Sequence, residues 1–157
     1  MIDFLLRPAA SPADIDLART LFREYADGLG ISLDFQGFEE ELAGLPGKYA
    51  EPAGTIVLAF DGGGAPLGCV ALRPLPAAGE CEMKRMYVRE AARGTGLGRR
   101  LSERILAEAR TRGYRRMRLD TLATLTPAIT LYRSLGFAPS APYGPPVEGV
   151  IYFSAEL

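Results

Sequence analysis

A glycine-rich turn between a hydrophobic strand and an amphipathic helix has the residue types and spacing best suited to chemistry. Its sequence is Arg93-Gly94-Thr95-Gly96-Leu97-Gly98. The first amides of a helix have no partner within the helix, and the helix dipole adds partial positive charge there. Glycines let phosphate groups approach such a backbone closely. The turn therefore predicts a binding site for a pyrophosphate.

The charges around this turn fit an anionic ligand. Residues 84–118 hold one Lys and eleven Arg against three Glu, a local charge of +9, whereas the whole chain of 157 residues carries −1. Such a local basic block indicates an anionic partner. A nucleic acid would also suit it, but the acidic remainder of the chain argues against that partner, and we expect none.

The composition excludes several kinds of catalysis. The sequence has no histidine, which rules out Ser-His-Asp and Cys-His catalysis and every metal site that uses histidine. Its two cysteines, Cys69 and Cys81, fall in strand-like segments, so we expect buried free thiols and no metal site. The chemistry must then use carboxylates, Tyr, Lys, Ser or Thr, or the backbone.

The elements that position these residues belong to one expected domain, residues 1–157. Hydrophobic residues make up 48% and charged residues 24%, as in ordinary globular proteins. No apolar run is long enough for a membrane span, and the N-terminus is too short and too acidic for a secretory signal. We therefore expect a cytoplasmic protein with no membrane partner, either a monomer or a homodimer.

Apolar periodicity and turn residues predict eleven elements. Strands are expected at 4–8, 55–60, 67–72, 80–88, 117–121, 137–138 and 150–156, and helices at 12–28, 35–45, 96–112 and 127–135. The resulting order is β-α-α-β-β-β-α-β-α-β-β. Hairpins followed by a strand-helix-strand crossover predict an α/β fold of the α+β type, a mixed sheet with helices on both faces.

The element order and two motifs resemble the GCN5-related N-acetyltransferase (GNAT) superfamily. The turn at 93–98 matches its acyl-CoA motif, Arg/Gln-x-x-Gly-x-Gly/Ala, and residues 128–137 match its Ala-x-x-Leu-Tyr-x-x-x-Gly-Phe helix. The resemblance implies a GNAT-like acyl-CoA N-acyltransferase fold, with a central, mostly antiparallel sheet of six or seven strands. The sequence departs from the family at Leu125, where many members have an asparagine that contacts the cofactor.

The same resemblance implies an activity. An N-acetyltransferase of this family transfers an acetyl group from acetyl-CoA to a primary amine of a small molecule or peptide, by direct attack in a ternary complex. Amides at the strand edge are expected to hold the pantetheine arm and the thioester carbonyl. The glycine-rich turn and one arginine, Arg99 or Arg100, are expected to bind the phosphates. The expected cofactor contacts are Met86, Tyr87, Val88, Arg93, Gly94, Thr95, Gly96, Leu97, Gly98 and Arg99.

Two catalytic roles follow from the resemblance. Tyr132 is expected to protonate the departing thiolate, because a phenol and a thiol have comparable pKa values. Glu82 is the first candidate to accept the proton of the amine, with Asp120 and Glu148 as alternatives. Cys81 should face the opposite side of its strand from Glu82, which argues against an acyl-cysteine.

The acceptor site is expected between the N-terminal helices and the C-terminal loop. Its candidate residues are aromatic, apolar or acidic, as in small-molecule sites: Tyr25, Phe35, Tyr143 and Glu148, with Leu33, Phe38 and Tyr152 beside them. The acceptor itself is not identified. A second hypothesis is a non-catalytic acyl-CoA-binding or regulatory module, which Leu125 and the open choice of base would favour.

Overall fold

A computed structural model describes residues 3–157, apart from the side chain of Phe35. It contains seven strands: β1 (Leu5–Pro8), β2 (Thr55–Phe60), β3 (Pro66–Pro74), β4 (Glu80–Val88), β5 (Arg116–Leu122), β6 (Ala138–Pro139) and β7 (Val150–Glu156). The helices are α1 (Pro12–Gly28), α2 (Phe38–Ala43), α3 (Leu97–Thr111) and α4 (Thr126–Ser134), with short 3-10 turns η1 (Asp34–Gln36), η2 (Gly47–Tyr49) and η3 (Glu90–Ala92).

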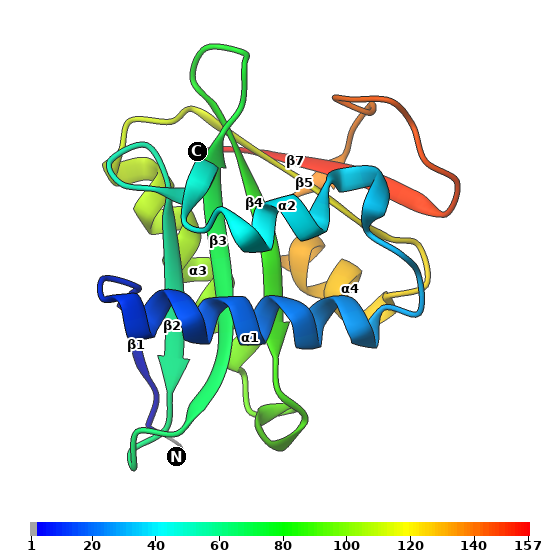
Figure 1. Cartoon of the computed structure of the whole chain (residues 1–157). Helices are drawn as coiled ribbons and strands as arrows, with labels where there is room; N and C mark the ends of the chain where they lie inside the picture. Colours follow the sequence, from blue (N-terminus) through cyan, green and yellow to red (C-terminus); the bar gives the residue numbers. More distant parts are fainter. Residues whose placement is uncertain (1–2) are drawn as a thin grey trace.

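The strands form one sheet in the order β1-β2-β3-β4-β5-β7-β6. Every neighbouring pair is antiparallel except β4 and β5, which are parallel. Helices α1 and α2 cover one face of the sheet, and α3 and α4 cover the other (Figure 1). The predicted mixed sheet with helices on both faces is confirmed, as is the predicted element order.

One predicted helix is wrong in its extent. The segment 35–45 forms η1 and then α2, separated by Gly37. Gly37 has a φ of 68°, a left-handed conformation that ends the first turn and precedes the next helix. The break leaves the polar side chain of Gln36 at the junction, where it faces the sheet residues described below.

Each face of the sheet has its own hydrophobic core. On the α3 face, the predicted stripe of Leu97, Leu101, Ile105 and Ala109 is buried against β2, β3 and β4. On the α1 face, residues of α1 and α2 pack on the opposite sides of the same strands. Leu33 and Phe38 belong to this second core, so they support the site without lining it.

An ion pair joins β1 to the start of α1. Ser11 caps α1 in a capping box with Asp14, and Asp14 also accepts hydrogen bonds from both terminal nitrogens of Arg7, at 2.7 and 3.0 Å. Only a tenth of the Asp14 side chain is exposed. The hydrogen bonds from Arg7 lower the pKa of this carboxyl far below its ordinary value, with burial opposing them.

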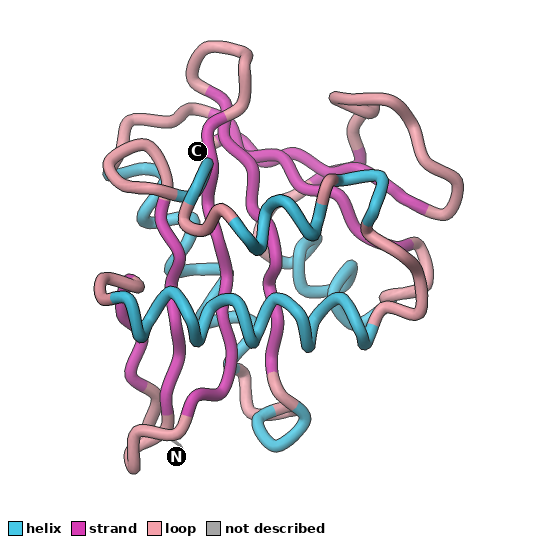
Figure 2. The backbone as a smooth tube through the Cα atoms, in the orientation of Figure 1, coloured by secondary structure: helices cyan, strands magenta, loops and turns pink. Residues whose placement is uncertain are grey.

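The central strand β4 is irregular where the site begins. It pairs with β5 only over Glu80–Glu82, after which the two strands diverge (Figure 2). Its pairing with β3 shifts by one residue near Arg85, whose φ is 58°. A bulge of this kind turns adjacent side chains to one side of the strand. Lys84 and Arg85 both face the α1 and α2 side as a result.

The strained backbone at Arg85 is held in place by its side chain. The guanidinium forms two hydrogen bonds to Glu41 of α2, at 2.9 and 3.0 Å, and lies 5.2 Å from the centre of the Phe38 ring. A non-glycine residue in this region costs on the order of 1–3 kcal/mol, which such contacts can offset. Helix α2 thus stabilises the bulge.

None of the helices formed by residues 3–157 is long and apolar enough to cross a membrane.

Candidate active site

The amides at the start of α3 are available to a ligand. Gly96 precedes the helix with a φ of 87°, and no side chain caps the first turn. A Cβ added to Gly98 would lie 3.6 Å from Leu131 of α4 and 3.9 Å from Met86 of β4. Gly98 therefore brings the helix start close to both elements, beside the edge of β4 that β5 leaves free. This arrangement presents unpaired donors and partial positive charge at one end of the gap.

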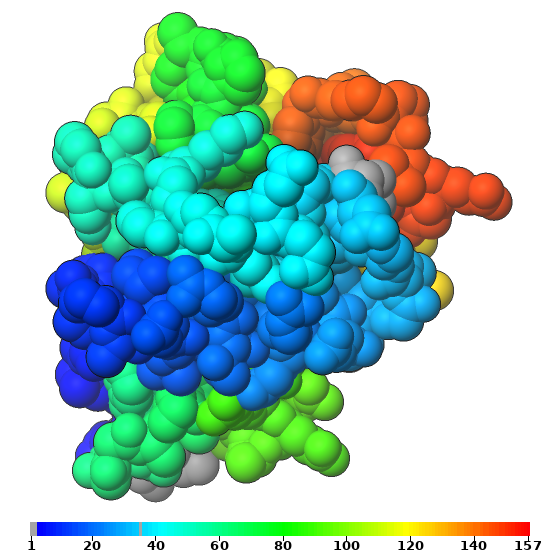
Figure 3. All heavy atoms as spheres, in the orientation of Figure 1, coloured from blue at the N-terminus to red at the C-terminus, as the bar shows by residue number. Residues whose placement is uncertain are grey.

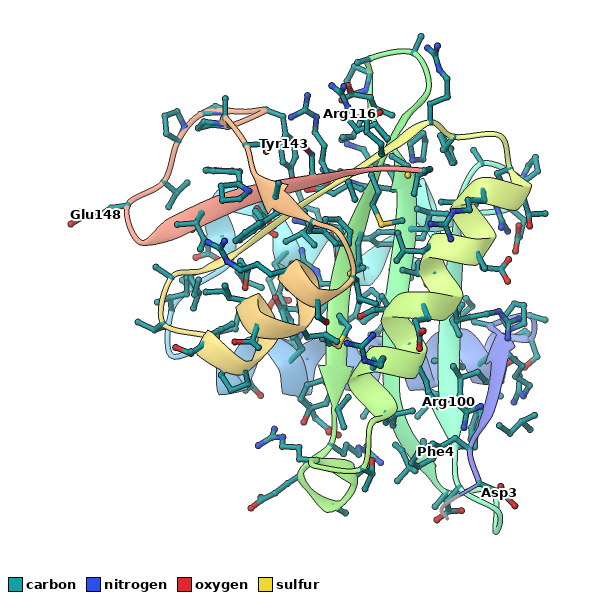
Figure 4. All side chains as sticks on the ribbon, turned by 180° about the vertical axis from the view of Figure 1, so that it is seen from behind. Asp3, Phe4, Arg100, Arg116, Tyr143 and Glu148 are labelled. Atoms are coloured by element: carbon teal, nitrogen blue, oxygen red, sulfur yellow. The ribbon has the colours of Figure 1, made fainter. Side chains whose placement is uncertain are left out.

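The arginines of the turn point in different directions. Arg93 donates a hydrogen bond to the carbonyl of Val88 at 3.1 Å. Arg99 reaches Ser134 of α4. Arg100 instead lies over the Phe4 ring, 5.5 Å from its centre, as Figure 4 shows. Of the two predicted alternatives, Arg99 is the one on the α4 side, near the free edge of β4.

A narrow inner pocket of about 50 Å³ fills the gap between β4, β5 and α4. Its apolar lining includes Met86, Leu119, Leu125 and Ala128, together with the ring of Tyr132. Tyr132 is 6% exposed and packs edge-on against Phe137. Burial raises the pKa of its phenol above the ordinary value, at which tyrosine is already protonated at neutral pH, and so makes it a weaker acid. Leu125 gives the pocket a hydrocarbon side chain where many family members have an amide.

A larger outer cavity of about 660 Å³ adjoins the inner pocket. It lies between α2, the β3–β4 loop and the loop 140–149, on the face drawn in Figure 3. Its polar lining includes Arg73, Glu82 and Tyr143. Lys84, Arg85 and Asp120 line both the cavity and the inner pocket, so the two spaces meet at these residues.

Glu82 is buried, and each of its carboxylate oxygens has a close partner. It is 1% exposed, and one carboxylate oxygen accepts a hydrogen bond from Arg73 Nε at 2.6 Å. The other oxygen accepts a hydrogen bond from the phenol of Tyr143. Burial, and then the negative charge of Glu82, raise the pKa of Tyr143. The structure thus brings the predicted residues Glu82 and Tyr143 together as partners.

Asp120 is held more loosely, where the inner pocket meets the outer cavity. One of its oxygens lies 3.5 Å from Lys84 Nζ, and the other accepts a hydrogen bond from Gln36 Nε2 at 3.3 Å. The Gln36 carbonyl oxygen accepts hydrogen bonds from Lys84 at 3.0 Å and from Arg85 at 2.8 Å. Gln36 therefore orients two cations and one carboxylate at once. A fifth of the Asp120 side chain remains exposed.

The other predicted acceptor residues are placed differently. Tyr25 lines the inner pocket and packs edge-on against Tyr87, with ring centres 6.3 Å apart. Tyr152 lines the outer cavity beside Tyr143. Glu148 is exposed and points away from the molecule, so the structure does not bring it to the cavity (Figure 4). The side chain of Phe35 lies outside the described residues.

Both cysteines are buried free thiols, as predicted. Cys81 lies in the α3-side core, on the opposite side of β4 from Glu82. Burial raises the pKa of the Cys81 thiol to about 12, so it remains protonated at neutral pH. Over residues 3–157, no three acidic or cysteine side chains come together to hold a metal ion.

Comparisons with known proteins agree with this geometry. The model of the Acetyltransferase (GNAT) family matches residues 18–137. An uncharacterized N-acetyltransferase of Schizosaccharomyces pombe is 43% identical over 93% of this chain and 90% of its own. One of Dictyostelium discoideum is 30% identical over 82% and 87%. The structure of a GNAT-family acetyltransferase from Staphylococcus aureus superposes with a TM-score of 0.80 at 15% identity, covering 98% of this chain and 99% of that one.

The fold and the site define an acyltransferase. The chain belongs to the GNAT acetyltransferase family. The resemblance seen in the two sequence motifs is therefore confirmed, and so is the GNAT fold, here with seven strands.

Sequence reasoning missed several polar residues of the outer cavity, four of which contact Glu82, Asp120 or each other. Lys84 shares a strand face with Glu82 by simple alternation, which is a signal that could have identified it. Arg73 lies opposite Glu82 on the neighbouring strand, but the pairing of β3 with β4 had to be known first. Arg85 reaches the cavity only because of the bulge, and Gln36 only because the predicted helix is broken at Gly37.

Proposed function

We propose that this protein is an N-acetyltransferase that uses acetyl-CoA and acts on a primary amine in a ternary complex. The observation that carries the proposal is the gap between β4 and β5, which has free helix amides at one end and a buried tyrosine in its wall. Acetyl-CoA supplies the acetyl group as a thioester, which an amine can attack directly. Both the free strand edge and the uncapped helix fit an extended pantetheine arm and its pyrophosphate.

Different residues along this gap have different roles in binding and catalysis. Amides of the turn at 94–98 bind the pyrophosphate, and Arg93 and Arg99 add positive charge. An amide within 86–88 donates to the thioester carbonyl oxygen. The Tyr132 phenol donates its proton to the thiolate as it departs.

A carboxylate at the junction accepts the proton of the amine. Glu82 and Asp120 are the two candidates, and we favour Asp120. It lines both the inner pocket and the outer cavity, whereas Glu82 lines only the cavity. Both oxygens of Glu82 already have close partners, but the contacts of Asp120 are long. Glu82 then orients Tyr143 and Arg73 toward the acceptor.

Acetyl-CoA binding is the first test. We expect calorimetric titration to give measurable binding by the wild type and strong loss in Gly96→Val. Gly113→Val is the matched control, because Gly113 lies after the other end of α3 with a similar φ of 84° and equally open surroundings. Equal loss of binding in both variants would mean that backbone strain, and not the ligand site, causes the effect. No binding by the wild type would refute the proposal.

Turnover is the second test. Release of free CoA thiol from acetyl-CoA should depend on an added amine, across a panel of amino acids, a polyamine, an aminoglycoside and a peptide. Binding without thiol release from any of them would instead favour the non-catalytic acyl-CoA-binding module.

A further inference from the structure

One ion pair at the junction of the two spaces is incompletely satisfied, unlike its neighbours. Arg85 and Glu41 are joined by two hydrogen bonds of 2.9 and 3.0 Å, and Arg73 lies 2.6 Å from Glu82. These are ordinary lengths for charge-assisted hydrogen bonds. Lys84 and Asp120 are separated by 3.5 Å, at the outer limit for a hydrogen bond. The long contacts at the junction all involve Lys84 or Asp120.

Lys84 has donors to spare although it is buried. Its side chain is 7% exposed, and an ammonium group carries three N–H donors. Only the bond to Gln36, at 3.0 Å, has an ordinary length. Glu82 lies 3.8 Å from Nζ, which is close enough for attraction but too far for a hydrogen bond. A buried ammonium in this state favours a ligand that brings acceptor oxygens.

Asp120 has the complementary deficit. Its two oxygens accept only the long contacts from Lys84 and Gln36, at 3.5 and 3.3 Å, although a carboxylate can accept about four hydrogen bonds. It faces the same junction as Lys84. The junction thus presents one cation and one anion side by side, each with unused hydrogen-bonding capacity.

We propose that the acceptor is a free α-amino acid, whose carboxylate binds Lys84 and whose amino group binds Asp120. This inference rests on the proposed function. An α-amino acid carries its two opposite charges on one carbon, so it can enter between Lys84 and Asp120 and replace their weak mutual contact with two short ones. A simple amine would leave Lys84 facing a second cation. The side chain of the amino acid would lie against the apolar wall of the outer cavity, formed by Pro76, Pro145 and Val147.

The test compares three acceptors that differ only at the α-carbon. They are L-phenylalanine, L-phenylalaninamide and 2-phenylethylamine, whose common ring suits the apolar wall. Thiol release should give a kcat/KM for phenylalanine about ten- to hundredfold above that for its amide, the discrimination expected of one charged hydrogen-bonded contact. Because the basicities of the amines differ, the decisive readout is the change of this ratio between the wild type and its variants.

Lys84→Met should collapse the ratio of amino acid to amide, and Lys84→Arg should preserve part of it. Lys48→Met is the competing variant, since Lys48 is an exposed lysine at the rim of the same cavity. Collapse in Lys48→Met with no change in Lys84→Met would overturn the assignment to Lys84. If Lys84→Met fails to fold, the partial loss of the ratio in Lys84→Arg remains the test.

The outcomes separate this inference from the proposed function. If the wild type acetylates the amide or the decarboxylated amine as well as the amino acid, the zwitterion inference fails and the N-acetyltransferase function stands. The same holds if only the polyamine or the aminoglycoside of the wider panel supports turnover. If acetyl-CoA binds and no amine releases thiol, the proposed function itself fails.

Discussion

Replacing Asp120 by asparagine tests which carboxylate accepts the proton of the attacking amine. Asparagine has nearly the same shape and keeps an oxygen that can face Lys84, but it cannot act as a base. A positioned general base contributes about 10²- to 10⁴-fold to a rate. We therefore expect Asp120→Asn to lower kcat by at least about a hundredfold, with little change in the dissociation constant of acetyl-CoA.

Glu82→Gln should behave differently, because of the partners of Glu82. Removing this charge leaves the Arg73 guanidinium without a carboxylate partner, and the single oxygen of glutamine can replace only one of the two oxygens that Arg73 and Tyr143 contact. Arg73 keeps 26% of its side chain exposed, so the loss should be about 2–3 kcal/mol, below the roughly 3–5 kcal/mol for breaking a fully buried pair. For a chain of this size that lowers Tm by about 4–12 °C.

The two variants are compared in thermal unfolding and in thiol release as a function of pH. In Asp120→Asn the rate deficit should shrink as pH rises, because more of the acceptor is then neutral before it binds. The reasoning is refuted if Glu82→Gln loses a hundredfold in kcat while its Tm is unchanged and Asp120→Asn retains its rate. In that case Glu82 is the base, despite its two close partners.

Three further predictions concern other residues. Tyr132→Phe should lower kcat at least about tenfold without weakening acetyl-CoA binding, and unchanged turnover would remove its role as an acid. Asp14→Asn should cost about 1–2 kcal/mol at pH 7, since Arg7 is partly exposed, and urea unfolding should show this cost shrinking below about pH 4. The cost decreases at low pH because folding lowers the pKa of Asp14. The ionised carboxylate therefore stabilises the fold above the unfolded-state pKa, and this stabilisation disappears as pH falls. An Asp14→Asn cost that was the same at pH 3 as at pH 7 would contradict this prediction. Cys69 and Cys81 should react with a thiol reagent only after unfolding, and fast modification of the native protein would contradict their burial.

Most of the fold was predictable because its signals are local. The stripe from Leu97 to Ala109 recurs every four residues, and each of its residues is buried in the structure. The strands at 55–60, 80–88 and 150–156 have their predicted bounds, since turn residues flank them. The two GNAT motifs are also local, so the gap between β4 and β5 could be expected from the resemblance.

The outer cavity was far less predictable, because it depends on contacts between distant segments. Gln36 and Asp120 are 84 residues apart, and nothing in the sequence distinguishes this glutamine from a solvated one. Regular alternation would place Arg85 on the opposite side of β4 from Lys84. The bulge reverses that expectation, and a single shift in pairing with β3 has no clear sequence signal.

The bulge connects the two halves of the site through one residue. The divergence of β4 from β5 leaves a free edge suited to an acyl donor, while the bulge turns Arg85 toward α2. There Arg85 shares the Gln36 carbonyl oxygen with Lys84, and the Gln36 amide reaches Asp120. The bulge therefore lies next to the strand edge proposed for the donor, and it also positions the charged groups proposed to face the acceptor. A regular strand at this position would place Arg85 on the opposite side of β4 from Lys84, away from Glu41 and Gln36.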